Sequence, residues 1–466
     1  MSFALNSFVL TLSSTLILLY LIGLGWLLNY WLLKQRFSQV TIEELPLLIS
    51  HIILSGIITN FTLVLLFQNL GTSIAIGIVI GIGGLIHLLA TIRKNINLGK
   101  TIKNFQKPEW WLIGLVLIAL YFLLITSTPI FEWDARSIWF LHGKMIYGSQ
   151  TIGLQAGWQH PSIQFSHVDY PKLIAVMSAQ IATIFGYWNE YLPKLSLIFL
   201  FIPLAITSIS FFYQDKVYLL MLIPILWVGD WLWNGYMDGY LALYFGMGIL
   251  LGYKFFNSKC FLYLQASSTF LISCLYLKNE GQMAVLVAII VFTIYLFSTM
   301  DSIFTKNNNF YFISGIVFIF QLIPFFLWSI YKLVWGIHND LKIGSQAFFH
   351  RILERISNQS WSTILMEITD QIILPLVIFL ILLIVLRNYN GIVISPTFFG
   401  VTALLYTLGM IFIYLSTPYD LGYHLRTSID RTMLPVAVVL WFGSFVLIEN
   451  LPLSSFPMIQ KQHTSS

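Results

Sequence analysis

The sequence predicts an all-α protein that crosses a membrane many times, and two properties of the chain support this prediction. Of its 466 residues, 58% are hydrophobic and 9% are charged, and the mean hydropathy is +0.82. Polar residues are therefore too few to cover the surface of a water-soluble protein of this length. Apolar runs of about 20 residues also recur, which is the length that a helix needs to cross the hydrocarbon core of a bilayer.

These apolar runs predict about thirteen membrane-spanning helices. They lie at residues 9–33, 45–68, 72–92, 109–129, 191–213, 217–233, 237–256, 260–277, 281–299, 310–334, 370–387, 397–416 and 431–450. A basic segment and a cleavage site are both missing before the first run, so we expect an uncleaved span there and no signal peptide. The shorter run 171–187 follows Tyr170-Pro171. We interpret it as an interfacial or re-entrant helix.

The basic residues divide between the loops in a way that predicts the orientation of the chain, because cytoplasmic loops carry an excess of Lys and Arg. On the cytoplasmic face we place the loops with Lys34, Arg36, Arg93, Lys94, Lys100, Lys103, Lys107, Lys216, Lys254, Lys259, Lys306 and Arg387. The extracytoplasmic face then holds loops 130–190, 335–369 and 417–430 and most of the acidic residues. Since the formal charge of +5 forms no extended basic tract, nucleic acid is not indicated as a partner.

Polar residues divide the chain into three regions. Residues 1–108 form N-terminal transmembrane helices, which we interpret as a packing module because their glycines allow helices to approach closely. Residues 109–300 contain the polar motifs and the large outer loop 130–190, and we interpret them as the catalytic core. Residues 301–466 form C-terminal transmembrane helices with two further outer loops, 335–369 and 417–430.

The outer loop 335–369 contains an amphipathic segment. In residues 347–356, we place Phe348, Ile352 and Ile356 on one helical face and Arg351, Glu354 and Arg355 on another. This pattern predicts a helix that lies in the membrane interface. Two interpretations stay open, a helix that floats at the headgroups and a lip that guides a lipid substrate.

The first outer loop begins with an unusual concentration of charged and aromatic residues, which are Glu132, Trp133, Asp134, Arg136, Trp139, His142 and Lys144. A chain with so few charges is unlikely to gather them here for solubility. Asp134 is our candidate general base, and the flanking Trp133 and Trp139 rings could stack on a sugar. The alternative is a helix cap in an aromatic belt. Arg136, His142 and Lys144 could bind substrate or only neutralise the two acids.

Further candidate residues belong to the same predicted face, and each also has a structural alternative. They are Asp169, Tyr170, Asp238, Lys278, Glu280, His424, Arg426 and Arg431. Asp238 could simply favour a helix N-terminus, Lys278 and Glu280 could form a structural ion pair, and Asp169-Tyr170-Pro171 could be a helix start. In the last loop, His424, Arg426 and Arg431 could hold a lipid phosphate by charge-assisted hydrogen bonds. The alternative there is an Asp430–Arg431 pair that marks the start of the final helix.

Read in order, these motifs resemble the GT-C superfamily of membrane glycosyltransferases, which includes the lipid A aminoarabinose transferase and the protein O-mannosyltransferases. The motifs are Glu132-Trp-Asp-Ala-Arg136, His167-Val-Asp-Tyr-Pro-Lys172, Gly186-Tyr-Trp-Asn-Glu190, Gly235-Tyr-Met-Asp238 and Lys278-Asn-Glu-Gly281. The resemblance covers residues 109–300 and implies a GT-C fold with a helical catalytic loop outside the membrane. The first family motif often reads Asp-Glu, whereas this chain has Asp134-Ala135.

The predicted function is transfer of a sugar from a polyprenyl-phosphate donor to a lipid, glycan or protein acceptor on the extracytoplasmic face of a plasma or inner membrane. Catalytic roles are expected for Asp134, Asp238 and Glu280. Substrate binding is expected for Glu132, Trp133, Arg136, His142, Lys144, Asp169, Tyr170, Lys278, His424, Arg426 and Arg431. Phosphate is a good leaving group, so cations that stabilise its charge can replace the general acid of a glycosidase.

Two other functions stay open at this point, a transporter or flippase for a lipid-linked or anionic solute, and a polymerase or ligase of surface polysaccharide. No nucleotide or metal-binding motif is present in the sequence, and Cys260 and Cys274 fall within one predicted span. A cofactor is therefore not indicated. A divalent cation held by Asp134 and Asp238 is possible, as in some members of the superfamily.

Overall fold

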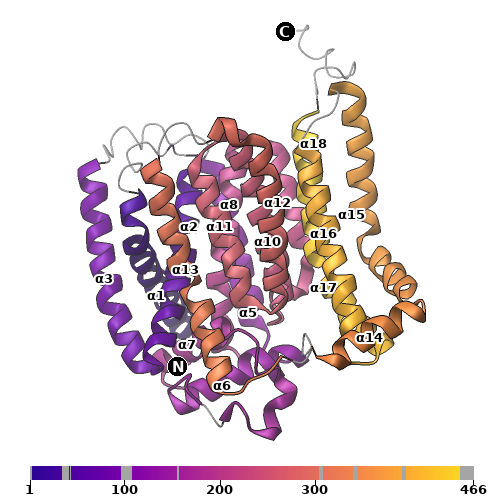
Figure 1. Cartoon of the computed structure of the whole chain (residues 1–466). Coiled ribbons are helices and arrows are strands. Elements are labelled where there is room, and N and C mark those ends of the chain that lie inside the picture. Colours follow the sequence, from indigo (N-terminus) through magenta and orange to yellow (C-terminus); the bar gives the residue numbers. More distant parts are fainter. Residues whose placement is uncertain are drawn as a thin grey trace, which may run out of the picture.

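A computed structural model describes residues 3–33, 41, 43–95, 108–154, 157–303, 308–339, 345–390 and 395–451 (Figure 1). These residues are almost entirely helical, and the β-pairing among them is one isolated bridge between Asn69 and Thr151. Eleven helices in the described part of the chain are long and apolar enough to cross a membrane. The prediction of an all-α, multi-pass membrane protein is confirmed.

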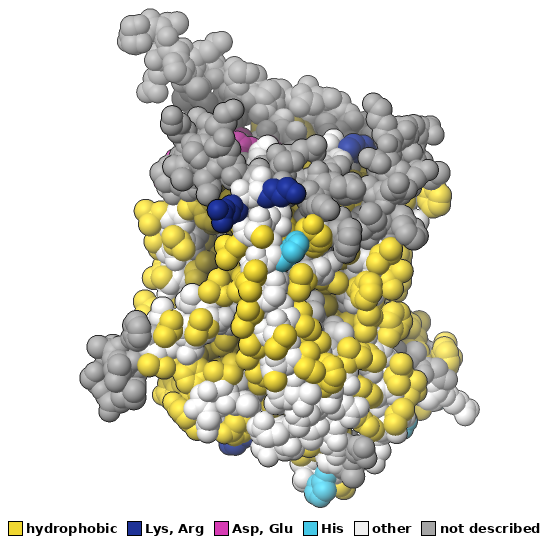
Figure 2. Space-filling model, turned by 90° about the vertical axis from the view of Figure 1, so that its left-hand side faces the viewer, with side chains coloured by type: hydrophobic (Ala, Val, Ile, Leu, Met, Phe, Trp, Pro, Cys, Tyr) yellow, Lys and Arg dark blue, Asp and Glu magenta, His cyan; other side chains and the backbone are white. Residues whose placement is uncertain are grey.

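The longer helices follow the predicted spans closely. They are α1 (Phe3–Leu33), α2 (Leu45–Phe67), α3 (Leu70–Asn95), α5 (Pro108–Ser127), α8 (Ser196–Gln214), α10 (Asp238–Ser258), α11 (Phe261–Leu277), α12 (Glu280–Ile303), α13 (Asn308–Val334), α15 (Ser360–Asn390), α16 (Ser395–Ser416) and α18 (Leu434–Glu449). Large hydrophobic side chains remain exposed on α1, α3, α5, α13 and α15. Figure 2 shows such side chains over the middle of the face that carries α3, as expected for a surface in contact with lipid.

Two predicted spans are shorter or less regular than the rest. Residues 217–233 form three short pieces, η5 (Lys216–Met221), α9 (Leu222–Val228) and η6 (Gly229–Leu232). The break after α9 falls at Gly229, which takes a positive φ of 57°. Helix α11 has 17 residues and is regular. Both segments still connect the two ends of the bundle, since Tyr218 contacts Glu449 at one end and Lys278 contacts Asp238 at the other. The count of about thirteen crossings stays a prediction.

Shorter helices cover the end of the bundle where α10 and α12 begin. They are α6 (Phe140–Ser149), α7 (Leu173–Phe185), α14 (Gln346–Ser357) and α17 (Leu421–Thr432). Helix α7 falls in the predicted interfacial or re-entrant stretch, and residues Leu173–Ala182 are all buried. The stretch 417–430, which we expected to be a loop, is mostly α17, whose N-terminus is capped by the Asp420 side chain through the Tyr423 backbone N–H at 2.8 Å.

The first three helices pack through their glycines. A Cβ atom added to Gly23 of α1 would lie 2.0 Å from the carbonyl oxygen of Gly81 on α3, and one added to Gly84 would lie 2.0 Å from that of Gly23. Only a residue without a side chain permits this approach, which is how helices pack closely in lipid. By contrast, Gly83 has no heavy atom within 4 Å of an added Cβ.

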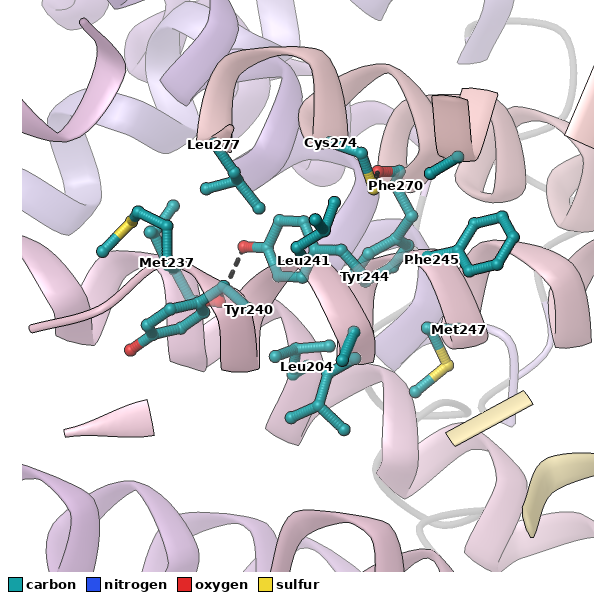
Figure 3. Packing of buried hydrophobic residues seen from close by; sticks show 14 of the residues in the cluster. Leu204, Met237, Tyr240, Leu241, Tyr244, Phe245, Met247, Phe270, Cys274 and Leu277 are labelled. Atoms are coloured by element: carbon teal, nitrogen blue, oxygen red, sulfur yellow. Dashed lines mark hydrogen bonds between the residues drawn. The ribbon is translucent and has the colours of Figure 1, made fainter. Parts of the chain in front are cut away.

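Helix α10 is the buried centre of the fold. It packs against α11, α12 and α18, and nearly all of its residues from Asp238 to Phe255 are buried. Figure 3 shows Tyr240 and Tyr244 packed among leucines, and their hydroxyls donate to the Leu197 carbonyl at 3.0 Å and the Leu200 carbonyl at 2.7 Å. These two bonds to α8 fix the position of α10 and therefore of Asp238 at its first turn.

Several charged residues used for the orientation lie outside the described residues, namely Lys34, Arg36, Lys100, Lys103, Lys107 and Lys306, as does the side chain of Arg387. Among the described ones, Arg93 and Lys94 end α3 and Lys254 lies in the last turns of α10. Lys254 binds Glu449 at the end of α18 with an Nζ–Oε1 distance of 3.0 Å. The acidic motifs begin α10 and α12, at the opposite end of the bundle.

This arrangement predicts the labelling pattern of two engineered cysteines in a Cys260→Ser, Cys274→Ala background. Ser149 ends α6 and Ser258 ends α10, and both side chains are exposed at opposite ends of the molecule. Because positive charge stays in the cytoplasm, Ser149→Cys should react with an impermeant maleimide on intact cells. Ser258→Cys should react only after permeabilisation. Labelling of both positions from the same side would contradict the orientation.

Candidate functional site

Five charged side chains meet at the end of the bundle where α10 and α12 begin, and we call them the charged cluster. They are Asp134, Asp238, Lys278, Glu280 and Arg431. Lys278 Nζ lies 2.7 Å from Asp238 Oδ1 and 3.1 Å from Glu280 Oε1. Arg431 Nη1 binds Asp134 Oδ2 and lies 3.9 Å from Asp238 Oδ2. Arg431 therefore lies between two carboxylates, and Lys278 between another pair.

Local backbone structure places each member of the cluster. Asp238 and Glu280 are the first residues of α10 and α12, and Lys278 precedes α12 in an extended conformation with a φ of −157°. Asp134 directly precedes a short π-helix, η1 (Ala135–Trp139), a local geometry that is common at functional sites. Arg431 lies in the last turn of α17, so this helix brings a distant segment of the chain to the other members of the cluster.

A tight contact beside Asp134 accounts for the small residue at position 135. Ala135 is fully buried, and a Cβ atom added to Gly235 would lie 2.7 Å from the Ala135 Cβ. Gly235 itself has a φ of 99°, which favours glycine. A glutamate at position 135 would not fit against this turn. The Asp134-Ala135 sequence is therefore a packing requirement of this chain.

The cluster is desolvated, and its charges are incompletely paired. Asp238 and Lys278 are only 3% and 4% exposed. Burial lowers the pKa of Lys278, but Asp238 and Glu280 outweigh this effect and raise the pKa above the usual value, so the ammonium stays charged. Asp238 Oδ2, Glu280 Oε2 and Arg431 Nε are buried and have no hydrogen-bond partner within the described protein. Such atoms are uncommon in native structures and mark groups that can bind a polar ligand.

Tyr236 adds an aromatic face to the cluster. The guanidinium carbon of Arg431 lies 5.2 Å from the centre of the Tyr236 ring, a cation–π geometry. The Asp134 backbone N–H donates to the Tyr236 hydroxyl at 3.5 Å. Burial, followed by the charge of Asp134, raises the pKa of Tyr236, so its hydroxyl stays neutral. In the sequence, Tyr236 belongs to the motif Gly235–Asp238. No local pattern there indicates that its ring contacts an arginine of α17.

Asp169 and Tyr170 lie next to the cluster. Asp169 Oδ2 accepts hydrogen bonds from Asn279 Nδ2 at 2.6 Å and Asn339 Nδ2 at 3.0 Å. Asn279 stands between Lys278 and Glu280 in the chain, so this contact joins Asp169 to the junction of α11 and α12. Tyr170 stacks on Trp139 with ring centres 5.3 Å apart. Burial raises its pKa well above the usual value, and nearby Glu280 adds to this effect.

His142, which we expected to bind substrate, is fully buried in a hydrogen-bonded chain beneath the outer loop. Its Nδ1 lies 3.0 Å from Lys172 Nζ and its Nε2 lies 3.0 Å from Ser166 Oγ. Lys172 Nζ also lies 4.6 Å and 5.0 Å from the ring centres of Trp158 and Trp328. Burial lowers the pKa of Lys172 well below its usual value, although Asp169 opposes this effect. These contacts indicate that His142 holds the loop together.

Other candidate residues make no described side-chain contact with the charged cluster. They are Glu132, Trp133, Arg136, Lys144 and Arg426. Trp133 is 64% exposed beside Asp134. Lys144 forms an exposed ion pair with Glu190 at 3.7 Å. Arg136 and Arg426 are also exposed. His424 packs against the Tyr414 ring at 5.0 Å, and its buried Nδ1 has no partner within the described protein.

Helix α14 forms where the amphipathic helix was predicted, but its two arginines lie on the same side as Phe348, which packs against Phe412 of α16 with ring centres 5.8 Å apart. Arg351 Nε donates to the Ser416 carbonyl at 2.8 Å. Arg355 donates to the carbonyls of Tyr414, Thr417 and Tyr419 at 2.8–2.9 Å. Cations are stabilising at the C-terminal carbonyls of a helix, here those of α16. Sequence reasoning placed these arginines on a polar face and missed their role in anchoring α14.

A divalent cation between Asp134 and Asp238 would compete with an arginine. Arg431 Nη1 contacts both carboxylates, so its guanidinium already lies between them. Among the described residues, no group of three or more His, Cys, Asp or Glu side chains has a geometry that could hold a metal ion.

The fold and this site were compared with known proteins. No protein-family model matches the chain, and neither the curated proteins nor the solved structures contain a match. The resemblance to GT-C glycosyltransferases therefore rests on the motifs of the sequence.

The buried pairs of Lys278 predict an asymmetric effect on stability. Lys278→Met should lower the free energy of unfolding by about 3–5 kcal/mol, because it leaves buried carboxylates without their cation. The matched control is Lys144→Met, whose pair with Glu190 is exposed, at 60% and 46% of the two side chains. That change should cost about 1 kcal/mol or less. Unfolding in mixed detergent micelles measures both values.

The pH dependence of the same measurement has a defined sign. The folded-state pKa of Lys278 is raised above 10.5, so its contribution is complete below that value and is lost only as the pH rises through the folded pKa. The Lys278 ammonium itself therefore adds no pH dependence through the neutral range. Any decrease in the difference between wild type and Lys278→Met on acidification should reflect protonation of the carboxylates that the variant leaves unpaired. Equal losses in the two lysine variants would show that Lys278 is not the buried partner described above.

Proposed function

We propose that the protein is an integral membrane glycosyltransferase of the GT-C type. It would cross the membrane about thirteen times and transfer a sugar from a polyprenyl-phosphate donor to a hydroxyl of a lipid, glycan or protein acceptor on the extracytoplasmic face. The observation that supports this proposal best is the position of Arg431 between Asp134 and Asp238. An arginine, a side chain well suited to binding phosphate, is thus in contact with the candidate general base.

The reaction needs a group that accepts the proton of the acceptor hydroxyl, and Asp134 fits this role. Its side chain is 18% exposed and is therefore accessible from the end of the bundle. The exposed Trp133 ring beside it offers a face for a sugar. As the acceptor oxygen bonds to the anomeric carbon, the bond from that carbon to the phosphate oxygen breaks. The hydroxyl proton passes to Asp134, and the electron pair of the broken bond stays with the phosphate.

Arg431 links donor binding to the activation of Asp134. A carboxylate that is paired with a guanidinium is a poor proton acceptor. The phosphodiester of the donor is an anion and competes with Asp134 for Arg431, which can bind phosphate through two parallel hydrogen bonds. Donor binding would then release Asp134 to act as the base. The departing phosphate gains a second negative charge, which Arg431 stabilises.

The remaining charged groups keep Arg431 in place. Asp238 lies below the guanidinium and is itself held by Lys278 at 2.7 Å. Removal of Asp134 from Arg431 by the donor would leave Asp238 as the counter-ion. Glu280 holds the second side of Lys278 at 3.1 Å. We therefore assign Asp238 and Glu280 to the positioning of the two cations.

The location of the cluster favours a transferase over a transporter or flippase. Transporters typically place their ionisable groups near the middle of the membrane, on interrupted helices. Asp238 and Glu280 instead begin α10 and α12, and Asp134 and Arg431 lie in or beside the short elements that cover this end. Chemistry at a membrane face suits a donor whose lipid stays in the bilayer while its sugar extends outwards.

Asp134→Asn tests the base. The variant should keep its fold, since the change is nearly isosteric, and should lose about 10²-fold or more in the rate of transfer, the usual scale for loss of a general base. The assay measures sugar transfer from a panel of radiolabelled polyprenyl-phosphate sugars. Glu190→Gln, an exposed carboxylate on the same end, is the control and should keep near-native turnover. A folded Asp134→Asn variant with wild-type turnover would remove Asp134 from the mechanism.

Arg431→Ala tests the phosphate contact. Loss of charged hydrogen bonds should weaken binding of a non-hydrolysable polyprenyl phosphonate by about 1.5–3 kcal/mol. Arg431→Lys should recover only part of this loss because lysine lacks the bidentate geometry.

The matched control comes from the same helix. Arg426 is exposed and makes no described contact with the cluster, so Arg426→Ala should change the affinity by about 0.5 kcal/mol or less. Competition binding measures all three variants. Unchanged affinity in folded Arg431→Ala would move the phosphate contact to another residue.

A further inference from the structure

A cavity with polar groups in its wall lies far from the charged cluster, between α2, α11 and α13. Its volume is about 210 Å³. Phe261, Leu264 and Gln265 of α11 line it on one side, and Gly315 and Phe318 of α13 on the other. Helix α11 begins at Phe261 and ends beside Lys278, so the cavity belongs to the opposite half of the bundle. Gly315 and Phe318 are exposed, which opens the cavity towards the lipid.

A chain of hydrogen bonds forms the inner wall of this cavity. His51 Nε2 lies 3.0 Å from Asn29 Oδ1, which can only accept, so His51 donates there. His51 Nδ1 then accepts from the Thr269 hydroxyl at 3.0 Å. Gln321 Nε2 donates to Ser55 Oγ at 3.0 Å and to Thr269 Oγ1 at 3.1 Å. Both ring nitrogens of His51 are therefore occupied, and the wall is polar without needing a charge.

Gln265 differs from the other polar residues of the wall. Its side chain is 92% buried, since only 8% is exposed, and its Nε2 has no hydrogen-bond partner within the described protein. A buried amide donor without an acceptor is costly in an apolar environment. Because Gln265 lines the cavity, a ligand there can supply the acceptor. Apart from His51, the lining residues are not ionisable, so a neutral oxygen suits this site better than an anion.

The depth of Gln265 indicates which neutral oxygen this is. Gln265 lies four residues after the start of α11, which corresponds to about 6 Å along the helix axis. Lys259 lies two residues before Phe261 and is exposed at the end of the bundle. A lipid with its phosphate near Lys259 therefore has its ester carbonyl close to the level of Gln265. Its glycerol would then lie beside Phe261, and its first methylene groups would contact Leu264 and Phe318.

We propose that this cavity is a binding site for a glycerophospholipid, in which Gln265 Nε2 donates a hydrogen bond to an acyl-ester carbonyl. The site is independent of the proposed transferase reaction, because none of its residues belongs to the charged cluster. It fixes a lipid between α11 and α13 in the leaflet opposite to the cluster. Lys259 contributes to recognition of the phosphate.

The full-length protein in nanodiscs of diether phosphatidylcholine, which lacks the ester carbonyl, tests this proposal with a trace of phosphatidylglycerol that carries a diazirine next to its ester. Labelled peptides should come from α11 and α13. Unlabelled diester phosphatidylglycerol should compete about five-fold better than its diether analogue, the effect of one neutral hydrogen bond. Equal competition by the two, or labelling spread evenly over all lipid-facing helices, would overturn the proposal. Equal competition by a diacylglycerol with the same chains would overturn the assignment to a phospholipid.

Two variants assign the effect to the cavity. Gln265→Met should abolish the preference for the diester, whereas Gln282→Met, an exposed glutamine in the first turn of α12, should keep it. Gly315→Leu provides a second test that leaves Gln265 intact. A Cβ atom at Gly315 has no heavy atom within 4 Å, so the larger side chain can be accommodated and should reduce labelling of α11. Persistence of the diester preference in folded Gln265→Met would contradict the hydrogen bond.

Discussion

The ion pair between Arg431 and Asp134 connects two residues that are 297 positions apart in the chain. It joins the outer loop before α6 to α17, and through Asp238 it also joins both to α10. Burial of ionised groups is costly unless each charge has partners with good geometry. Three carboxylates and two cations share this cost in the charged cluster. Removal of any one of them changes the pairing of the others, which makes the cluster a single unit.

Packing of the helices that carry Asp238 and Glu280 holds this unit in position. Buried tyrosines bind α10 to backbone carbonyls of the segment that contains α8, so Asp238 has a fixed position at the start of a rigid helix. Glycine contacts do the same for α12, because a Cβ atom at Gly281 would lie 1.9 Å from the Cys274 carbonyl. Asp238 and Glu280, which each have a buried oxygen without a hydrogen-bond partner within the described protein, thus belong to well-packed helices. A site of this kind is prepared for a ligand before the ligand arrives.

Local sequence patterns were sufficient for the features that depend on nearby residues. Composition and apolar runs predicted an all-α membrane protein, and the spacing of Phe348, Ile352 and Ile356 predicted α14. Motifs also identified the members of the charged cluster, because ionisable residues are rare in this chain and their presence at span ends is informative. These predictions required no knowledge of contacts between distant segments.

Features that depend on tertiary contacts were not predictable in the same way. Nothing near Arg431 in the sequence indicates that it binds Asp134 while Arg426, five positions earlier, stays exposed. The polar residues 421–430 resembled a loop, but their helix is stabilised by the Asp420 cap and by packing against α15, α16 and α18. His142 was expected to bind substrate because its buried partner, Lys172, lies 30 residues away and is not evident from the neighbouring sequence.

The central claim is that a lipid phosphate displaces Asp134 from Arg431. A cryo-electron microscopy structure of the full-length protein with a non-hydrolysable polyprenyl phosphonate tests it directly. The account predicts phosphonate oxygens within hydrogen-bond distance of the Arg431 guanidinium, with the Asp134 carboxylate separated from it and facing the bound headgroup. A phosphonate bound elsewhere, with Arg431 still in contact with both Asp134 and Asp238, would contradict the account.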